Sequence, residues 1–280
     1  GLGEKEIAQD ILYGIHTVRA LENFDLHGKT VNYQLIRGIV MVKKAAALTY
    51  EELHPEKEQI YHAISEACDE ILYEEKREYF PLQALQGGAG PSKNMNVNEV
   101  LANLALIKLG RQPGEYTYVH PIDDVNRGQS TNDVYPTGLR IAAIRQLRIL
   151  SEECAELQKA LQKKEVEYQD IKKLGRTELM DAVPITLGEE FGAYAQGIAR
   201  DRWRLYKVEE RLRQINLGGT AVGGNDTTER KYRFRVVEKL RTLTGLGLAA
   251  AEYPMDITQN MDVYVEVSGL LKALAVNLLK

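Results

Sequence analysis

The feature that most constrains the fold is an uninterrupted run, residues 139–173, that contains neither glycine nor proline. Apolar side chains recur in it at steps of three and four, namely at Ile141, Ile144, Leu147, Leu150, Cys154, Leu157 and Leu161. This spacing predicts one buried stripe on an α-helix. Extended from about residue 131 to Leu174, the helix would have ~40 residues and a length of ~60 Å. Such a rod is too long for one small globule and is typical of a helical bundle.

The residues in front of this rod, Gln129 to Asp133, are polar. A helix N-terminus carries unpaired N–H groups and a positive partial charge, so it attracts a carboxylate or phosphate. Ser130, Thr131 and Asn132 would add side-chain donors there. Alternatively, Ser130 is simply the N-cap and Asp133 completes a capping box. From the pentapeptide alone, the capping interpretation is favoured over an anion site.

Apolar spacing predicts further helices along the chain, at 33–52, 55–76, 97–109, 184–215, 227–243 and 258–280. Residues 1–32 are expected to be irregular, residues 175–184 a polar break, and residues 86–94 and 216–225 glycine-rich turns. Short connections between long helices favour antiparallel neighbours in a bundle. We therefore expect an all-α fold, with a mostly helical N-terminal domain (1–130) followed by a long central helical bundle (131–280).

Composition excludes several classes of function. The net charge of -4 and pI near 5.9 give no reason to expect nucleic acid as a partner. Apolar runs are much shorter than the ~20 residues of a membrane span, and the polar first ten residues do not resemble a signal peptide. Cys68 and Cys154 lie 86 positions apart on helical stripes. They are expected to be buried free thiols in a reducing cytoplasm.

Two other stretches lead to further expectations. His120, Asp123 and Asp124 gather one imidazole and two acids, but they lack the spacing of strong metal motifs, so a solvated loop is preferred to a metal site. The apolar stripe of the last helix continues to Lys280 without a stop signal. This pattern leads us to expect a piece of a longer protein.

Four segments taken together resemble the aspartase/fumarase superfamily. They are QGGAGPSKNMNVNEVLAN (86–103), HPIDDVNRGQSTNDVYPTG (120–138), GRTELMDAVPITLGEEF (175–191) and NLGGTAVGG (216–224). Weaker matches at 12–24, 37–47 and 258–276 extend the resemblance over the whole chain in the right order. It implies a cytoplasmic, all-helical homotetramer that needs no organic cofactor. Its active sites would combine residues of several subunits and take a small dicarboxylate or amino acid such as fumarate or L-aspartate. We name no metal-binding residue.

The chemistry implied by the resemblance is removal of a proton beside one carboxylate and expulsion of ammonia or water from the next carbon, which gives fumarate. The intermediate, an aci-carboxylate, carries a second negative charge, and each donor aimed at it is worth ~3 kcal/mol by analogy with oxyanion holes. By the family pattern Ser130 and Thr131 supply such donors, and Asn132 lies near the leaving group. Thr177 contacts the other carboxylate.

Departures from the family pattern affect the choice of substrate. Pro91 stands where a substrate-contacting threonine is common, which leaves Ser92 as a possible substitute. Ile122 and Asp124 also differ from the usual residues. Glu178 occupies the position of a fumarase histidine, and its carboxylate could pair with a substrate ammonium, which favours an amine leaving group. The structural alternative is that Glu178 is a solvated acid near a helix start.

The family's catalytic base is a serine in a glycine- and serine-rich loop, and no stretch of these 280 residues matches that loop. We therefore name no catalytic residue, and we expect the chain by itself to be inactive. Three hypotheses follow: elimination of ammonia from L-aspartate, hydration of fumarate to L-malate, and a non-catalytic relative acting as an assembly subunit. Pro91, Ile122 and Asp124 favour the third, whereas Glu178 favours the first.

Overall fold

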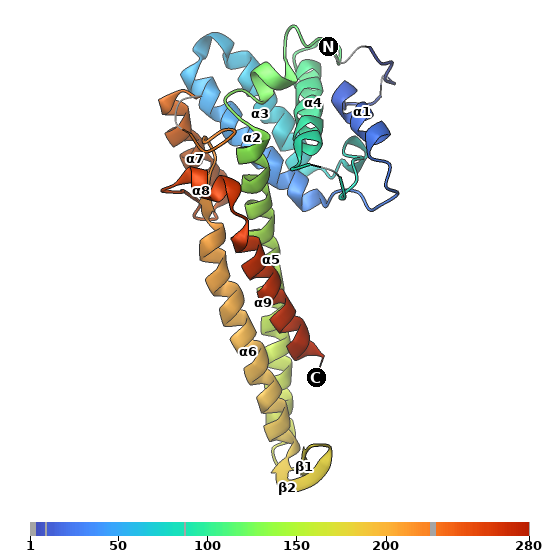
Figure 1. The fold of residues 1–280 in the computed structure, drawn as a ribbon, viewed down its shortest axis with the longest axis vertical. Helices are drawn as coiled ribbons and strands as arrows, with labels where there is room; N and C mark the ends of the chain where they lie inside the picture. Colours follow the sequence, from blue (N-terminus) through green and yellow to red (C-terminus); the bar gives the residue numbers. More distant parts are fainter. Residues whose placement is uncertain (1–3, 9, 87, 225–227, 280) are drawn as a thin grey trace. The chain divides into compact units, whose positions relative to one another are not determined.

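The computed structural model describes residues 4–8, 10–86, 88–224 and 228–279, which divide into two compact units. One unit comprises Gly1–Ala142 and Arg213–Asn260, and the other comprises Ala143–Leu212 and Met261–Lys280. Helices dominate both units, with short paired strands beside them, so the all-α expectation is confirmed (Figure 1).

The first unit is a cluster of helices around an aliphatic and aromatic core. Its helices are α1 (Ile15–Asn23), α2 (Tyr33–Leu53), α3 (Glu58–Tyr73), α4 (Pro91–Lys108), the beginning of α5 (Thr131–Glu167), α7 (Arg230–Thr244) and α8 (Pro254–Gln259). Short 3₁₀ turns span Pro55–Lys57 and Arg77–Tyr79, and β3 (Gln214–Ile215) pairs in parallel with β4 (Ala249–Ala250). The ring of Tyr50 stacks between Tyr61 and Tyr232, at centroid distances of 5.5 and 4.6 Å.

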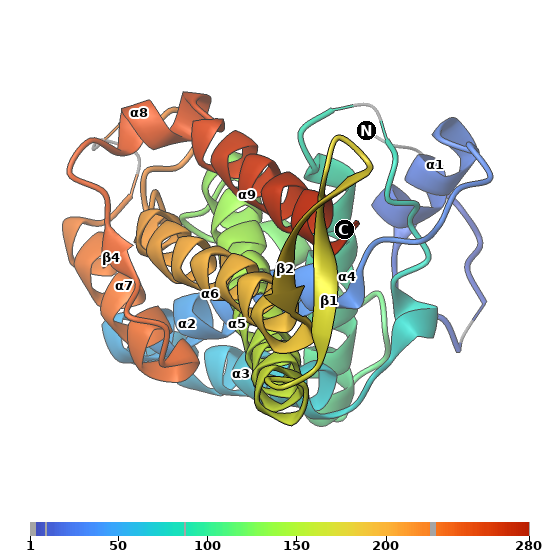
Figure 2. The same ribbon diagram turned by 90° about the horizontal axis from the view of Figure 1, so that it is seen from below.

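Helix α1 corrects the expectation that residues 1–32 are irregular. Its first backbone N–H groups are satisfied by a side chain from α4, because Glu99 accepts bonds from the backbone of Gly14, His16 and Thr17 at 2.9, 2.8 and 3.2 Å. Figure 2 shows α1 and α4 in one view. The acceptor is more than 80 residues away, so no local pattern could have indicated this helix start.

Helix α4 begins at Pro91, six residues before the predicted start. Proline suits the first helical position, where the missing N–H would have no partner in any case. Gly90 precedes it with a φ of 97°, a left-handed conformation that favours glycine. A Cβ at Gly90 would lie 2.5 Å from the ring of Tyr135, so the start of α4 packs directly on α5.

Helices α2 and α5 cross where a glycine stands on each. A Cβ added at Gly38 would lie 2.2 Å from the carbonyl oxygen of Gly138, and one at Gly138 would lie 2.9 Å from the backbone nitrogen of Ile39. Larger side chains would force the two backbones apart. This close approach brings the middle of α2 against the first turns of α5.

The second unit contains the rest of α5, α6 (Leu187–Leu212) and α9 (Asp262–Leu278). Helices α6 and α9 lie side by side (Figure 1). Asn260 and Met261 separate α8 from α9, which corrects the single helix predicted for 258–280. Thr227 and Lys280, the ends of two predicted helices, lie outside the described residues.

A β-hairpin corrects the sequence prediction between the two long helices. Helix α5 ends at Glu167 rather than near Leu174, and β1 (Lys172–Thr177) pairs antiparallel with β2 (Met180–Thr186). Pro184 therefore belongs to a strand and does not open α6. A reciprocal pair starts α6 instead, because Glu189 N donates to Thr186 Oγ1 at 3.1 Å and Thr186 N donates to Glu189 Oε2 at 2.7 Å.

The two thiols and the membrane expectation can also be compared with the structure. Cys68 and Cys154 are both free and buried, as predicted. Within the part of the chain that the structure describes, no helix combines the length and the apolar character that crossing a bilayer requires.

Candidate active site

The start of α5 forms the capping box that the sequence suggested. Ser130 N donates to Asp133 Oδ1 at 2.9 Å, and Asn132 N donates to Ser130 Oγ at 3.2 Å. Helical hydrogen bonding begins there, since Val134 N reaches Ser130 O at 3.0 Å. The end of the rod is therefore held in one conformation by its own side chains.

The second oxygen of Asp133 connects this helix start to the glycine-rich loop after β3. Oδ2 accepts bonds from Gly218 N and Thr220 N, both at 3.0 Å, and the carboxylate is fully buried. Burial raises the pKa of Asp133 to about 6, although its three N–H donors and nearby Lys43 act in the opposite direction. The capping role was predicted from the sequence, whereas this long-range clamp was not.

Asn132 strengthens the junction between the helix and the loop. Its side-chain Nδ2 donates to Ala221 O at 2.8 Å, and its backbone carbonyl oxygen accepts a bond from Asn216 Nδ2 at 3.0 Å. Thr220, between these contacts, has a φ of 54°, which is unusual for a β-branched residue. The loop therefore keeps a strained conformation beside α5, as functional sites often do.

Helix α4 supplies an amide to the same place. Asn94 Nδ2 donates to Thr131 Oγ1 at 3.2 Å and to Asn126 Oδ1 at 3.1 Å, and Asn98 Nδ2 reaches that same Asn126 oxygen at 3.3 Å. Asn94 and Asn98 are buried. The beginnings of α4 and α5 therefore meet at Thr131.

A lysine lies beneath this junction. Lys43 Nζ, on α2, donates to Asn126 Oδ1 at 2.7 Å and to Gln129 Oε1 at 3.0 Å, and the side chain is fully buried. Burial lowers its pKa to about 7, partly offset by the charge of Asp133. Sequence reasoning missed Lys43. The available signal was a cation next to Val42, in the predicted stripe that includes Ile39 and Ala46.

The arrangement leaves two hydroxyl groups free to donate. The oxygens of Ser130 and Thr131 each accept a bond from a protein N–H group, and neither hydroxyl donates one to any residue that the structure describes. Both residues are partly exposed. Two hydroxyl protons beside a helix N-terminus can bind an anion.

The other predicted site residues lie elsewhere. Ser92, in the first turn of α4, lines a hollow of about 510 Å³ with His16, Arg19 and Phe24. Thr177 ends β1 in the second unit, and Glu178 follows it at the tip of the hairpin. The structure thus gathers Ser130, Thr131 and Asn132 at one helix end and places Thr177 and Glu178 in the other unit.

The hairpin tip has an unusual backbone. Glu178 and Leu179 have φ angles of 51° and 65°, the pair of positive values that a type I′ turn requires and that asparagine or glycine usually provides. Glu178 is exposed to solvent. It lies at a hairpin tip, which corrects the expectation that it stands near a helix start.

The segment around His120 is more ordered than the solvated loop that was preferred. Pro121–Val125 form a π-helical turn in which Asp124 is buried, accepting His120 N at 2.8 Å and Lys57 Nζ at 2.7 Å. Only the tip is open, with Ile122 43% exposed. Among the described residues, no cluster of three or more His, Cys, Asp or Glu could hold a metal ion.

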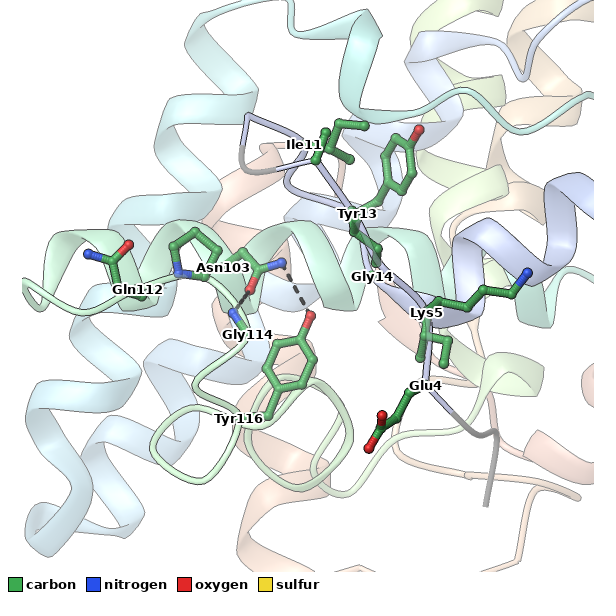
Figure 3. A pocket seen from close by; sticks show the side chains of 13 residues that line it. Glu4, Lys5, Ile11, Tyr13, Gly14, Asn103, Gln112, Gly114 and Tyr116 are labelled. Atoms are coloured by element: carbon green, nitrogen blue, oxygen red, sulfur yellow. Dashed lines mark hydrogen bonds between the residues drawn. The ribbon is translucent and has the colours of Figure 1, made fainter.

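Another hollow, of about 480 Å³, lies beside residues 4–8 and 11–15 (Figure 3). Its central amide, Asn103, donates to Leu12 O and Tyr116 Oη at 2.7 and 3.2 Å and accepts Gly114 N at 2.9 Å. Burial raises the pKa of Tyr116 to about 12. These polar groups are engaged with one another, so the hollow offers less chemistry than the start of α5.

Comparisons with known proteins agree on one family. A family model described as Lyase matches residues 3–280. Among curated proteins, the aspartate ammonia-lyases of Corynebacterium glutamicum, Escherichia coli K12 and Bacillus subtilis are 47%, 44% and 41% identical to this chain over its whole length. The chain spans only 54%, 59% and 59% of these relatives.

Solved structures show the same relationship. A fumarate lyase:delta crystallin from Brucella melitensis, bound to cobalt, matches with a TM-score of 0.96 and 42% identity, covering 99% of this chain and 61% of that one. A class II fumarase from Schistosoma mansoni matches with a TM-score of 0.94 and 28% identity, covering 99% and 62%. The family resemblance of the sequence is thereby confirmed.

Proposed function

The chain belongs to this lyase family, and from that premise we propose that the whole protein is an aspartate ammonia-lyase, which reversibly eliminates ammonia from L-aspartate to give fumarate. The observation that carries the proposal is the pair of hydroxyl donors, Ser130 and Thr131, at the start of α5. Whole-chain identity of 41–47% to three proteins of that activity supports it.

In the proposed mechanism, the start of α5 binds the carboxylate beside the carbon that loses its proton. Removing that proton places a second negative charge on the carboxylate, as an aci-carboxylate. The Ser130 and Thr131 hydroxyls donate to this charge, and the helix N-terminus favours it. Because the capping box and Asn94 hold both oxygens in place before substrate arrives, little reorganisation accompanies the reaction. No base is assigned within this chain.

The leaving group is proposed to be an amine because of Glu178. A carboxylate can pair with an ammonium group, and the strained turn at the hairpin tip supports a functional role for this exposed acid. Thr177 is proposed to contact the substrate's other carboxylate, Asn132 to lie near the amine, and Ser92 to replace the hydroxyl that Pro91 lacks.

Assembly into a homotetramer is also proposed. The hairpin exposes large apolar side chains, with Leu179 96%, Met180 65% and Val183 64% exposed. Such a surface is typical of an interaction site, and a second copy of the chain would cover it. Two buried free thiols support a cytoplasmic location.

The test is fumarate formation, followed by ultraviolet absorbance, after the full-length gene product is given L-aspartate or, separately, L-malate. We expect fumarate from L-aspartate alone. We also expect Glu178→Gln to raise KM for L-aspartate by ~10-fold, since the charged partner of the ammonium is lost. Fumarate from L-malate alone would assign a fumarase instead. No product from either, in a folded assembly, would favour the non-catalytic relative.

A further inference from the structure

We propose that Lys43 is a positioning residue that sets the direction of the Thr131 hydroxyl, acting through Asn126 and Asn94. The inference deepens the proposed function and rests on it. Lys43 itself contacts Asn126 and Gln129, so it acts on the site only through other side chains.

The first step follows from what a lysine can do. Its protonated form, the ammonium group, carries three donors and no acceptor, so the Asn126 atom 2.7 Å away must then be the amide oxygen. Gln129 is fixed in the same way, because its oxygen lies 3.0 Å from Nζ. Two of the three N–H bonds are used, which means that Lys43 orients both amides on the turn leading into Ser130.

The second step passes this direction to α4. Because Asn126 Oδ1 faces Lys43, any other side chain that bonds to this oxygen must be a donor. Asn94 and Asn98 both donate to it through Nδ2. Their own oxygens are buried and have no hydrogen-bond partner within the described residues. The nitrogens facing Asn126 therefore determine how these amides lie, even though two acceptors remain unsatisfied.

The third step reaches the proposed site. The same Nδ2 of Asn94 donates its second proton to Thr131 Oγ1, at 3.2 Å. A hydroxyl oxygen that accepts from this side keeps its own proton for a different acceptor. If Asn94 were reversed, its oxygen would take the Thr131 proton and the donor would be lost to the substrate. Lys43 thus keeps Thr131 a donor from two side chains away.

The experiment is a mutant cycle in the full-length protein, with Lys43→Met, Thr131→Val and the double variant, measuring kcat and KM for L-aspartate. Lys43→Met should lower kcat/KM ~10-fold or more, mainly through kcat, because removal of one oxyanion donor costs ~10²–10³. In the Thr131→Val background, Lys43→Met should lower kcat/KM by less than ~2-fold, because the hydroxyl through which Lys43 acts is already absent. Equal losses in both backgrounds, or no loss in either, would overturn the inference.

A second variant covers the case in which Lys43→Met does not fold. Asn94→Asp keeps the shape of the side chain but offers only acceptors, so Thr131 would donate to it. It should lower kcat/KM in the wild-type background and add little in the Thr131→Val background. Simple charge repulsion would persist in both backgrounds and would contradict the inference. Asn96→Asp is the matched control, because that buried amide on the same helix bonds Tyr79 O instead.

Binding of succinate, which has no leaving group, separates this inference from the proposed function. Wild-type protein that forms no fumarate but binds succinate contradicts the ammonia-lyase activity alone. The cycle is then read from the succinate Kd, which Lys43→Met should raise by only ~3-fold, and only when Thr131 is present, because the carboxylate of succinate lacks the additional charge of the aci-carboxylate. Wild-type protein that neither reacts nor binds succinate overturns both.

Discussion

The start of α5 and the tip of the β1–β2 hairpin are both proposed to bind substrate, but they are built in opposite ways. At the start of α5, Asp133 and Lys43 are fully buried and each bonds groups from distant parts of the chain. At the hairpin tip, Glu178 and Leu179 are exposed. The first region is held in place by contacts within this chain, whereas the second presents apolar surface that a second copy is proposed to cover.

The difference suggests a division of labour. Stabilising a charge that appears only during the reaction requires donors fixed beforehand, which buried networks provide. Recognising the remainder of the substrate requires only complementary groups that can approach it. We therefore expect changes at α5 to affect the chemical step and changes at the hairpin to affect binding.

The largest effect is expected from the buried clamp. Asp133→Ala leaves the N–H groups of Ser130, Gly218 and Thr220 without their acceptor, which should cost at least ~3 kcal/mol of local stability. Amide hydrogen exchange at Gly218 and Thr220 should accelerate by ~10²-fold or more. Asp181→Ala, which removes an exposed hairpin carboxylate 3.5 Å from Arg176, should leave these rates unchanged. If both variants changed the exchange rates of Gly218 and Thr220 equally, the contrast between the two regions would be contradicted.

The next effect concerns pH. Burial lowers the pKa of Lys43 to about 7. Above this pH, Lys43 is neutral in the folded chain but still protonated in the unfolded chain. Stability from this group therefore rises with pH, and the unfolding free energy of wild type relative to Lys43→Met should increase by ~1 kcal/mol per pH unit between about pH 7.5 and 9.5. Urea denaturation measures it. A constant difference would mean that folded Lys43 keeps its proton throughout this pH range, and would contradict the lowered pKa.

The smallest effect is expected at the hairpin tip. Leu179→Gly relieves a left-handed conformation at φ 65° and should stabilise the hairpin by ~0.5 kcal/mol. Val183→Gly, at an exposed position within β2, should destabilise it by a similar amount. Hydrogen exchange in β1 reports both changes. If both glycines destabilise, the turn is not strained.

Sequence reasoning predicted those features that have a local pattern. Helix α2 and the core of α5 followed from apolar spacing, and the polar residues before α5 could be recognised as a capping box. The hairpin was missed because no glycine or proline interrupts the helical run before Leu174. The two residues of the hairpin turn also include neither the asparagine nor the glycine that usually marks such a turn. Helix α1 was missed because its cap comes from Glu99, far along the chain.

The supporting residues of the site were missed for the same physical reason. Lys43, Asn94 and Asn126 meet through contacts that span more than 30 and up to 83 positions. Single buried polar residues on helices leave no periodic signature. The crossing of α2 and α5 at Gly38 and Gly138, which brings Lys43 close to the start of α5, is likewise a long-range contact.

The most direct test of the central claim compares Thr131→Val with Thr177→Val in the full-length protein, by steady-state kinetics of fumarate formation from L-aspartate. Thr131→Val should lower kcat by ~10²-fold, because its hydroxyl acts on charge that develops in the transition state. Thr177→Val should mainly raise KM, since its contact is equal in ground and transition states. A wild-type kcat in Thr131→Val, or a greater loss of kcat in Thr177→Val, would contradict the account.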